Sequence, residues 1–329
     1  MGLFLRLAFR KRERVSMNTI LNNIFQSVSE DADTFNRLFY HFLWAAGIVF
    51  LLVMGATVYV ILKFRVRKFT KALKPEPKMQ WLERATIFLA SGIILLFLAL
   101  TIMAVTDIQR QPEKGQQADI VIVGHQWWWE IRYPEEWVMV ANELHIPTGK
   151  RLWVRLESAD VVHDWYVPAL GRKADMVPGV TNYIWMQARK PGVYEGACNE
   201  YCGAQHAWMR IRVVAHSPQD FGQWINSQQE LAKTPSSAIA EKGKALFEEK
   251  VCGNCHAIRG TKAVATVGPD LTHVASRKTL LGGKYENNFE NLRAWIANPQ
   301  GMKPGAHMPN FIMTEKEIDA IAAYLYTLK

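Results

Sequence analysis

The sequence predicts a multi-domain membrane protein that combines a two-helix transmembrane hairpin, an all-β domain and a C-terminal all-α domain. Two long apolar runs lie in the first third of the 329 residues, short β-type runs separated by turn formers follow, and helical periodicity returns at the end. Roughly 100 to 200 residues per domain is usual, so this length allows two or three units.

The two apolar runs predict transmembrane helices at about 41–62 and 86–105, within a hairpin spanning 37–106. A helix rises about 1.5 Å per residue, so about 20 apolar residues cross a bilayer core of about 30 Å. Neither run contains an acidic or strongly basic side chain. A pair of buried core helices is the alternative.

The segment between these runs sets the expected orientation. It is rich in lysine and arginine, and short basic loops stay on the cytoplasmic side. Both ends of the hairpin and everything after Asp107 are therefore expected on the periplasmic or outer side of a bacterial inner membrane. The N-terminal tail (1–36) begins with basic residues that oppose export, so we hypothesise that the true start is Met17. The net charge of +9 comes partly from these basic stretches, and no nucleic-acid-reading motif is present, so we predict no nucleic-acid partner.

Residues 107–216 predict the β domain. Runs such as ADIVIVG, RLWVRLES and MRIRVVA alternate with the turn formers PTGK, VPGV and KPGVY, a layout typical of a β-sandwich or barrel.

A dense set of soft ligands lies near the end of this domain, in EGACNEYCGAQHAWM (195–209). Thiolates, an imidazole and a thioether together favour copper over hard cations. A disulfide is the alternative on cysteine count, and zinc remains possible although methionine is a poor zinc ligand. His163, in ESADVVHDWYVPALG, is isolated in the sequence and is either structural or a further ligand.

The other two cysteines form a second motif after a predicted linker (217–239). Cys252, Cys255 and His256 make the C-x-x-C-H pattern of c-type haem attachment, in which both thiols bond the haem and the histidine binds iron. A thioredoxin-like redox pair is the alternative, but no βαβ pattern surrounds the motif. The C-terminal domain is expected at 240–329, closing with an amphipathic helix in EKEIDAIAAYLYTLK.

The residues from about Arg37 to Ala215 resemble cytochrome c oxidase subunit II. The resemblance rests on HDWYVPALG and the later C-x-E-x-C-G-x-x-H-x-x-M, which follow two apolar runs and GHQWWWE. It implies a cupredoxin-like Greek-key barrel that holds the dinuclear copper centre CuA. The ligands it implies are the bridging thiolates and their partners: Cys198, Cys202, His163, His206, Met209 and the backbone carbonyl of Glu200.

The same resemblance implies roles at the contact with subunit I. The Glu200 side chain would help to hold magnesium there, and Asp175 and Lys173 match family positions at that contact; a solvated loop carboxylate is the alternative. Trp127 resembles the tryptophan through which electrons enter, although aromatic anchoring at the membrane interface is an alternative. Glu83 is proposed as a proton-uptake carboxylate or as a plain interfacial charge, because the Trp and Pro that often follow in the family are missing here.

Residues 240–329 resemble class I cytochrome c, with Gly243 and Phe247 before the haem motif and GPDL after it. The sixth iron ligand must come from NPQGMKPGAHMPNFIM, where Met302, His307 and Met313 compete with Met308. The pattern KPG-x-x-MP favours Met308, with His307 as the alternative.

Together the three parts resemble subunit II of caa-type haem-copper oxidases. The resemblance implies electron flow from an external soluble or membrane-bound donor to haem c, to CuA and to haem a of subunit I, with oxygen reduction and proton pumping elsewhere. Subunit I, other oxidase subunits and the lipid bilayer are the implied partners. A stand-alone membrane-anchored shuttle and a copper-handling assembly protein are the alternatives.

Overall fold

The structure is a computed structural model, and it describes residues 27–65, 80–110, 112 and 115–329. The proposed start at Met17 and most of the basic loop lie outside these residues. The described residues form two compact units: one lies within 33–110, and the other contains 27–32 and the described residues from 112 to 329.

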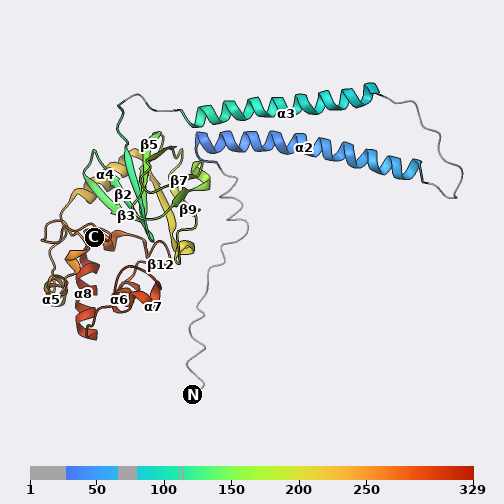
Figure 1. The fold of residues 1–329 in the computed structure, drawn as a ribbon. Helices are drawn as coiled ribbons and strands as arrows, with labels where there is room; N and C mark the ends of the chain where they lie inside the picture. The colour runs from blue at the N-terminus through green and yellow to red at the C-terminus, as the bar shows by residue number, and fades with distance from the viewer. Residues whose placement is uncertain (1–26, 66–79, 111, 113–114) are drawn as a thin grey trace, which may run out of the picture. The chain divides into compact units, whose positions relative to one another are not determined.

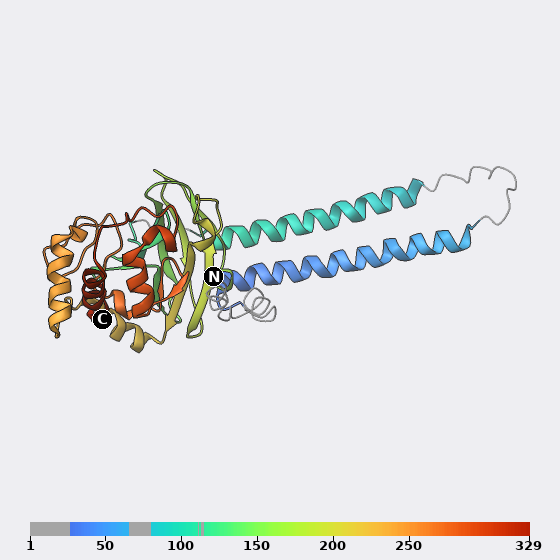
Figure 2. The same ribbon diagram turned by 90° about the horizontal axis from the view of Figure 1, so that it is seen from below.

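The first unit is a helical hairpin. Helices α2 (Glu30–Lys63) and α3 (Gln80–Ile108) run side by side in Figures 1 and 2, and Phe42 meets Phe97 edge to face at 6.1 Å. Both are long and apolar enough to cross a membrane, as predicted. They extend beyond 41–62 and 86–105 because neither glycine nor proline interrupts the polar flanks. The Ser29 hydroxyl accepts the Ala32 backbone N–H at 3.0 Å and so caps the start of α2.

The second unit begins with two five-stranded sheets, in the orders β3-β2-β1-β5-β8 and β4-β10-β9-β6-β7. Most neighbours are antiparallel, but β1 pairs with β5 and β10 with β4 in parallel, so the chain crosses between the sheets. This confirms the predicted cupredoxin-like barrel. The strands are β1 (Ile120–His125), β2 (Trp128–Tyr133), β3 (Val138–Ala141), β4 (Glu143–Pro147), β5 (Leu152–Ser158), β6 (His163–Tyr166), β7 (Ala174–Met176), β8 (Asn182–Met186), β9 (Gly192–Cys198) and β10 (Arg210–His216).

The inward-facing side chains of both sheets form one core. Trp129 and Trp165 are fully buried and meet edge to face with ring centroids 5.1 Å apart. The described part of the predicted N-terminal tail joins this domain, because the Val28 N–H donates to Ala169 and its carbonyl accepts from Arg189. The β domain therefore uses chain from both sides of the hairpin.

The span predicted as linker, 217–239, contains a helix. Helix α4 (Pro218–Gln229) is capped by Ser217, and its Phe221, Trp224 and Ile225 pack against the core of the β domain. These three apolar residues repeat at helical spacing within a polar segment, which explains both the helix and its docking.

The C-terminal domain consists mainly of helices α5 (Ala238–Glu249), α6 (Phe289–Ala297), α7 (Pro299–Met302) and α8 (Glu315–Thr327), with the short pair β11 (Thr279–Leu280) and β12 (Tyr285–Glu286). Helices α5 and α8 pack at Gly243, where an added Cβ would lie 1.9 Å from the Ala320 carbonyl oxygen. A capping box between Thr314 and Glu317 begins α8. The predicted all-α domain is confirmed.

Candidate metal and haem sites

The predicted copper ligands converge at one end of the second sheet. His163 is the first residue of β6, Cys198 is the last of β9, and Met209 directly precedes β10, which pairs with β9. The loop between β9 and β10 supplies the remaining donors, and its short 3-10 helix, η2 (His206–Trp208), turns His206 back toward the sulfur atoms. Antiparallel pairing thus brings together residues that are far apart in the sequence.

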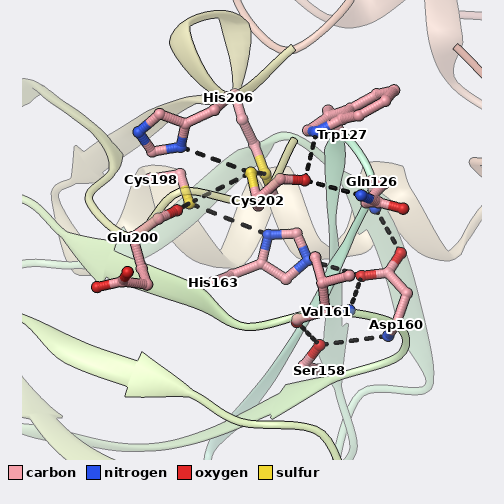
Figure 3. A network of polar contacts seen from close by, with 11 residues as sticks. Gln126, Trp127, Ser158, Asp160, Val161, His163, Cys198, Glu200, Cys202 and His206 are labelled. Carbon is pink, nitrogen blue, oxygen red and sulfur yellow. Dashed lines mark hydrogen bonds and ion pairs between the residues drawn. The ribbon is translucent and has the colours of Figure 1, made fainter. Parts of the chain in front are cut away.

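The donor atoms form one compact set (Figure 3). The two cysteine Sγ atoms are 3.8 Å apart. Cys198 Sγ lies 4.0 Å from His163 Nδ1 and 3.3 Å from the Glu200 carbonyl oxygen. Cys202 Sγ lies 3.5 Å from His206 Nδ1 and 3.7 Å from Met209 Sδ. The other four predicted donors therefore surround the two cysteine sulfur atoms, and both cysteines are free thiols rather than a disulfide.

The two neighbouring thiols can both be ionised only beside a cation. The neighbouring Cys202 thiol lowers the pKa of Cys198 to about 3, and the same contact, with burial, raises the pKa of Cys202. Two thiolates this close repel each other, so both are ionised only when positive charge lies between them. Soft sulfur and imidazole donors suit copper, and the chemistry of the set fits a dicopper centre.

Asp160 orients the His163 ring, a role that the motif analysis missed. The His163 side chain is fully buried, and its Nε2 lies 2.8 Å from Asp160 Oδ1, which leaves Nδ1 facing the sulfur. Asp160 Oδ atoms also accept the backbone N–H groups of Gln126 and Val161, each at 2.6 Å. Burial opposes the charge on Asp160, but these hydrogen bonds hold its pKa below the ordinary value. An aspartate three residues before the histidine was the available signal.

Trp127 touches the cluster directly. Its indole Nε1–H donates to the Cys202 carbonyl oxygen at 2.9 Å, and the Gln126 side chain donates to the same oxygen at 2.8 Å. Trp127 is 7% exposed because loops of the helical domain cover it, and its ring lies 5.9 Å from that of His307. The tryptophan therefore lies between the sulfur cluster and the C-terminal domain.

The residues predicted at the subunit contact lie on the surface of the β domain. Glu200 is exposed, and Figure 3 shows its carboxylate turned away from the sulfur atoms. Lys173 and Asp175 are also exposed, at and before the start of β7. Asp175 lies opposite Asp164, which is fully buried; burial and the Asp175 carboxyl raise the pKa of Asp164 to about 7. In the other unit, Glu83 is exposed in the first turn of α3.

The C-x-x-C-H motif lines a cavity of about 300 Å³. The His256 Nδ1–H donates to the Pro269 carbonyl oxygen at 2.8 Å, which leaves Nε2 available to bind iron. Gly268 is required beside this ring, because an added Cβ would lie 2.7 Å from His256 Cε1. The free thiols of Cys252 and Cys255 also line the cavity, so the residues fit a covalently held haem.

The residues of the C-terminal loop that line this cavity narrow the choice of the sixth iron ligand. Met308, Met313 and His307 line the cavity, but Met302 does not, and its carbonyl oxygen accepts the Lys284 ammonium at 2.7 Å. His307 lies against Trp127, and Met313 packs against the helical core. Met308 stays a prediction, consistent with its place on the wall.

The cavity is shared between the two domains. Trp127, Trp128, His125 and Asn142 of the β domain line it together with the haem-motif residues. Trp128 stacks on His125 at 4.3 Å, so both aromatic rings form part of this wall.

Three features together define the class of this protein: the β barrel with its soft-ligand cluster, the C-x-x-C-H domain and the two apolar helices. They are those of a membrane-anchored electron-transfer protein that carries copper and haem c.

A family model described as "Cytochrome C oxidase subunit II, periplasmic domain" matches residues 135–216, and one described as "Cytochrome c" matches 240–329. The chain is 37% identical to cytochrome c oxidase subunit 2 of Alkalihalophilus pseudofirmus over 72% of its own length and 70% of that protein. It is 28% identical to the Bacillus subtilis protein of the same name, over 82% of each chain.

The chain belongs to the cytochrome c oxidase subunit 2 family. Among solved structures, it is similar to the periplasmic domain of subunit II of cytochrome oxidase of Bradyrhizobium japonicum, with 31% identity and a TM-score of 0.33 over 35% of this chain and 96% of that one. Its CuA and cytochrome c domains give it the role of passing electrons into a haem-copper oxidase.

Proposed function

We propose that Cys198, Cys202, His163, His206, Met209 and the Glu200 carbonyl are the ligands of CuA. The observation that carries this proposal is the convergence of the other four donors on two cysteine sulfur atoms 3.8 Å apart. A dicopper centre held there supplies one-electron transfer with small structural change, because the charge is shared over two metals and two thiolates. The rigid strands on which the ligands stand favour this, and Asp160 keeps His163 in the tautomer that presents Nδ1.

The helical domain is proposed to hold haem c through Cys252 and Cys255, with His256 and Met308 as axial ligands. Histidine with methionine raises the haem potential, which suits an electron carrier. Pro269 positions the His256 ring, and the burial of that ring lowers the His256 pKa and so keeps Nε2 unprotonated.

Trp127 is proposed to be the residue through which electrons pass from the haem side to the copper side. Its ring forms part of the haem cavity wall, and its N–H is hydrogen-bonded to the backbone of a copper ligand. In this arrangement the external donor, a soluble or membrane-bound protein, delivers electrons to haem c.

The exposed face near Glu200 is proposed to contact subunit I. A carboxylate oxygen suits magnesium, and Lys173 and Asp175 lie exposed on β7 and just before it. The hairpin is proposed to anchor the protein in a bacterial inner membrane among other oxidase subunits and lipid, with both metal domains on the periplasmic side. Glu83, exposed at the start of α3, is retained as a proposed proton-uptake residue.

The test is purification from membranes with mild detergent, followed by haem staining of the denatured chain. We expect covalent haem on this chain, its loss when Cys252→Ser and Cys255→Ser are combined, and co-purification of a large haem-copper subunit. A chain that purifies alone would instead indicate a stand-alone shuttle, and a chain with one labile copper and no haem would indicate a copper-handling protein.

A further inference from the structure

Two buried charged side chains cross the contact between the β domain and the cytochrome domain, one in each direction. Lys303 of the cytochrome domain and Glu143 of the β domain are each 4% exposed. Charged side chains are rarely buried this completely unless a partner satisfies them. We call Lys303 and Glu143 the interdomain latch.

The Lys303 ammonium is satisfied by three backbone carbonyl oxygens. It donates to Trp127 at 2.7 Å, to Leu281 at 3.1 Å and to Trp208 at 3.5 Å. An ammonium has three N–H donors, so the site matches its full capacity. Trp127 and Trp208 belong to the β domain, one beside the haem cavity and one in the CuA loop, directly before Met209.

Glu143, at the start of β4 in the β domain, binds backbone groups of the cytochrome domain in the opposite direction. Its Oε1 accepts the backbone N–H groups of Lys278 at 3.0 Å and Thr279 at 2.9 Å, and the Thr279 hydroxyl at 2.9 Å. The Arg212 guanidinium lies 3.8 Å from the same carboxylate. The Glu143 carboxylate is thus hydrogen-bonded to the backbone of the cytochrome domain at the start of β11.

Two neutral hydrogen bonds also join the β domain to the cytochrome domain. The Arg210 N–H donates to the Gly282 carbonyl at 3.0 Å, and the Gln205 side chain donates to the Pro304 carbonyl at 2.7 Å. The loop that carries Lys303 continues to His307, whose ring lies against Trp127. One continuous contact therefore links the CuA loop, Trp127 and the loop that carries Met308.

We propose that the interdomain latch holds the cytochrome domain in one pose over Trp127, and that Lys303 is a positioning residue for electron transfer from haem c to CuA. The electron-transfer part of this proposal rests on the proposed function. Each group loses its water on burial and recovers hydrogen bonds only when the two domains meet in this geometry, so each adds little net affinity but favours one pose. The haem-bearing domain is therefore docked at a fixed position, rather than diffusing to its electron acceptor on a flexible tether.

The test compares Lys303→Met and Glu143→Leu, which removes the acceptor oxygens, with Lys316→Met, an exposed lysine of α8, in the complete oxidase. Hydrogen–deuterium exchange reports the pose without reference to activity. We expect the amides of 278–284 to exchange about tenfold faster or more in both latch variants, because an unpaired buried partner destabilises the docked state, and to be unchanged in Lys316→Met. Haem and copper contents should remain those of the wild type.

Flash-induced electron transfer from haem c to CuA gives the second readout. We expect it to slow in both latch variants and to become sensitive to solvent viscosity, because the domain must then find its pose. Wild-type exchange in 278–284 for either latch variant that retains haem and copper would overturn the proposal. If Lys303→Met loses its haem, Glu143→Leu alone decides. Absence of haem or copper from the wild-type protein would instead overturn the proposed function.

Discussion

The replacement Asp160→Ala should weaken copper binding although Asp160 is not a copper ligand. The substitution removes the acceptor for His163 Nε2 at 2.8 Å and for the backbone N–H of Gln126 at 2.6 Å. The His163 side chain is fully buried, whereas the side chain of Asp160 is 26% exposed, so water that reaches the vacated space sets the lower end of the cost. An unsatisfied buried donor costs about 1–3 kcal/mol, which corresponds to about 5- to 150-fold in affinity. This range overlaps the 10- to 100-fold loss that is typical when a partner of a ligating histidine is removed, so we expect about 10- to 100-fold.

The assay is a competition titration of the purified protein with a copper chelator, followed by the electron paramagnetic resonance spectrum. Asp160→Asn should lose less, because its amide oxygen still accepts from His163 Nε2–H. Glu135→Ala, an exposed acidic residue in the turn between β2 and β3, is the matched control and should bind copper normally. Wild-type copper affinity in Asp160→Ala would refute the role of Asp160 as the group that orients His163.

Three further predictions address electron transfer, haem ligation and pH. Trp127→Phe should keep its copper, because Gln126 still donates to the Cys202 carbonyl oxygen. It should slow electron transfer from haem to copper, measured by flash photolysis. An unchanged rate would exclude Trp127 from the route. Met308→Ala should change the haem absorption spectrum while Met302→Ala does not, and the reverse pattern would reassign the sixth ligand. Burial lowers the pKa of His145 to about 3, so the folded β domain binds fewer protons than the unfolded chain below pH 6.5. The free energy of unfolding, measured with urea, should therefore be highest above pH 6.5 and fall as the pH drops toward about 3. It should fall less steeply in His145→Phe, which has no imidazole to protonate. Parallel pH profiles for the two proteins would contradict this.

Local motifs carry the predictions of copper and haem because each motif is short and chemically specific. Cys198, Cys202, His206 and Met209 lie within one loop, so their convergence follows from sequence spacing alone. His163 could be joined to them only through the resemblance, because strand pairing between β6 and β9 closes that distance.

Long-range contacts account for what the sequence did not predict. Lys303 reads as an ordinary loop lysine, yet three carbonyl groups from distant segments enclose it. Glu143 likewise follows a β run without any signal that it accepts backbone N–H groups of Lys278 and Thr279. Helix α4 shows the same limit: the linker was predicted from the small and polar residues of TPSSAIA, and the docking of Trp224 and its neighbours on the barrel is a long-range contact.

Electron paramagnetic resonance of the membrane-extracted oxidase tests the central claim most directly. We predict the spectrum of one unpaired electron shared equally by two copper nuclei, and the loss of this spectrum when Cys202→Ser removes one of the two sulfur atoms that lie 3.8 Å apart. A spectrum of one isolated copper in the wild-type protein, or a shared-electron spectrum that survives Cys202→Ser, would contradict it.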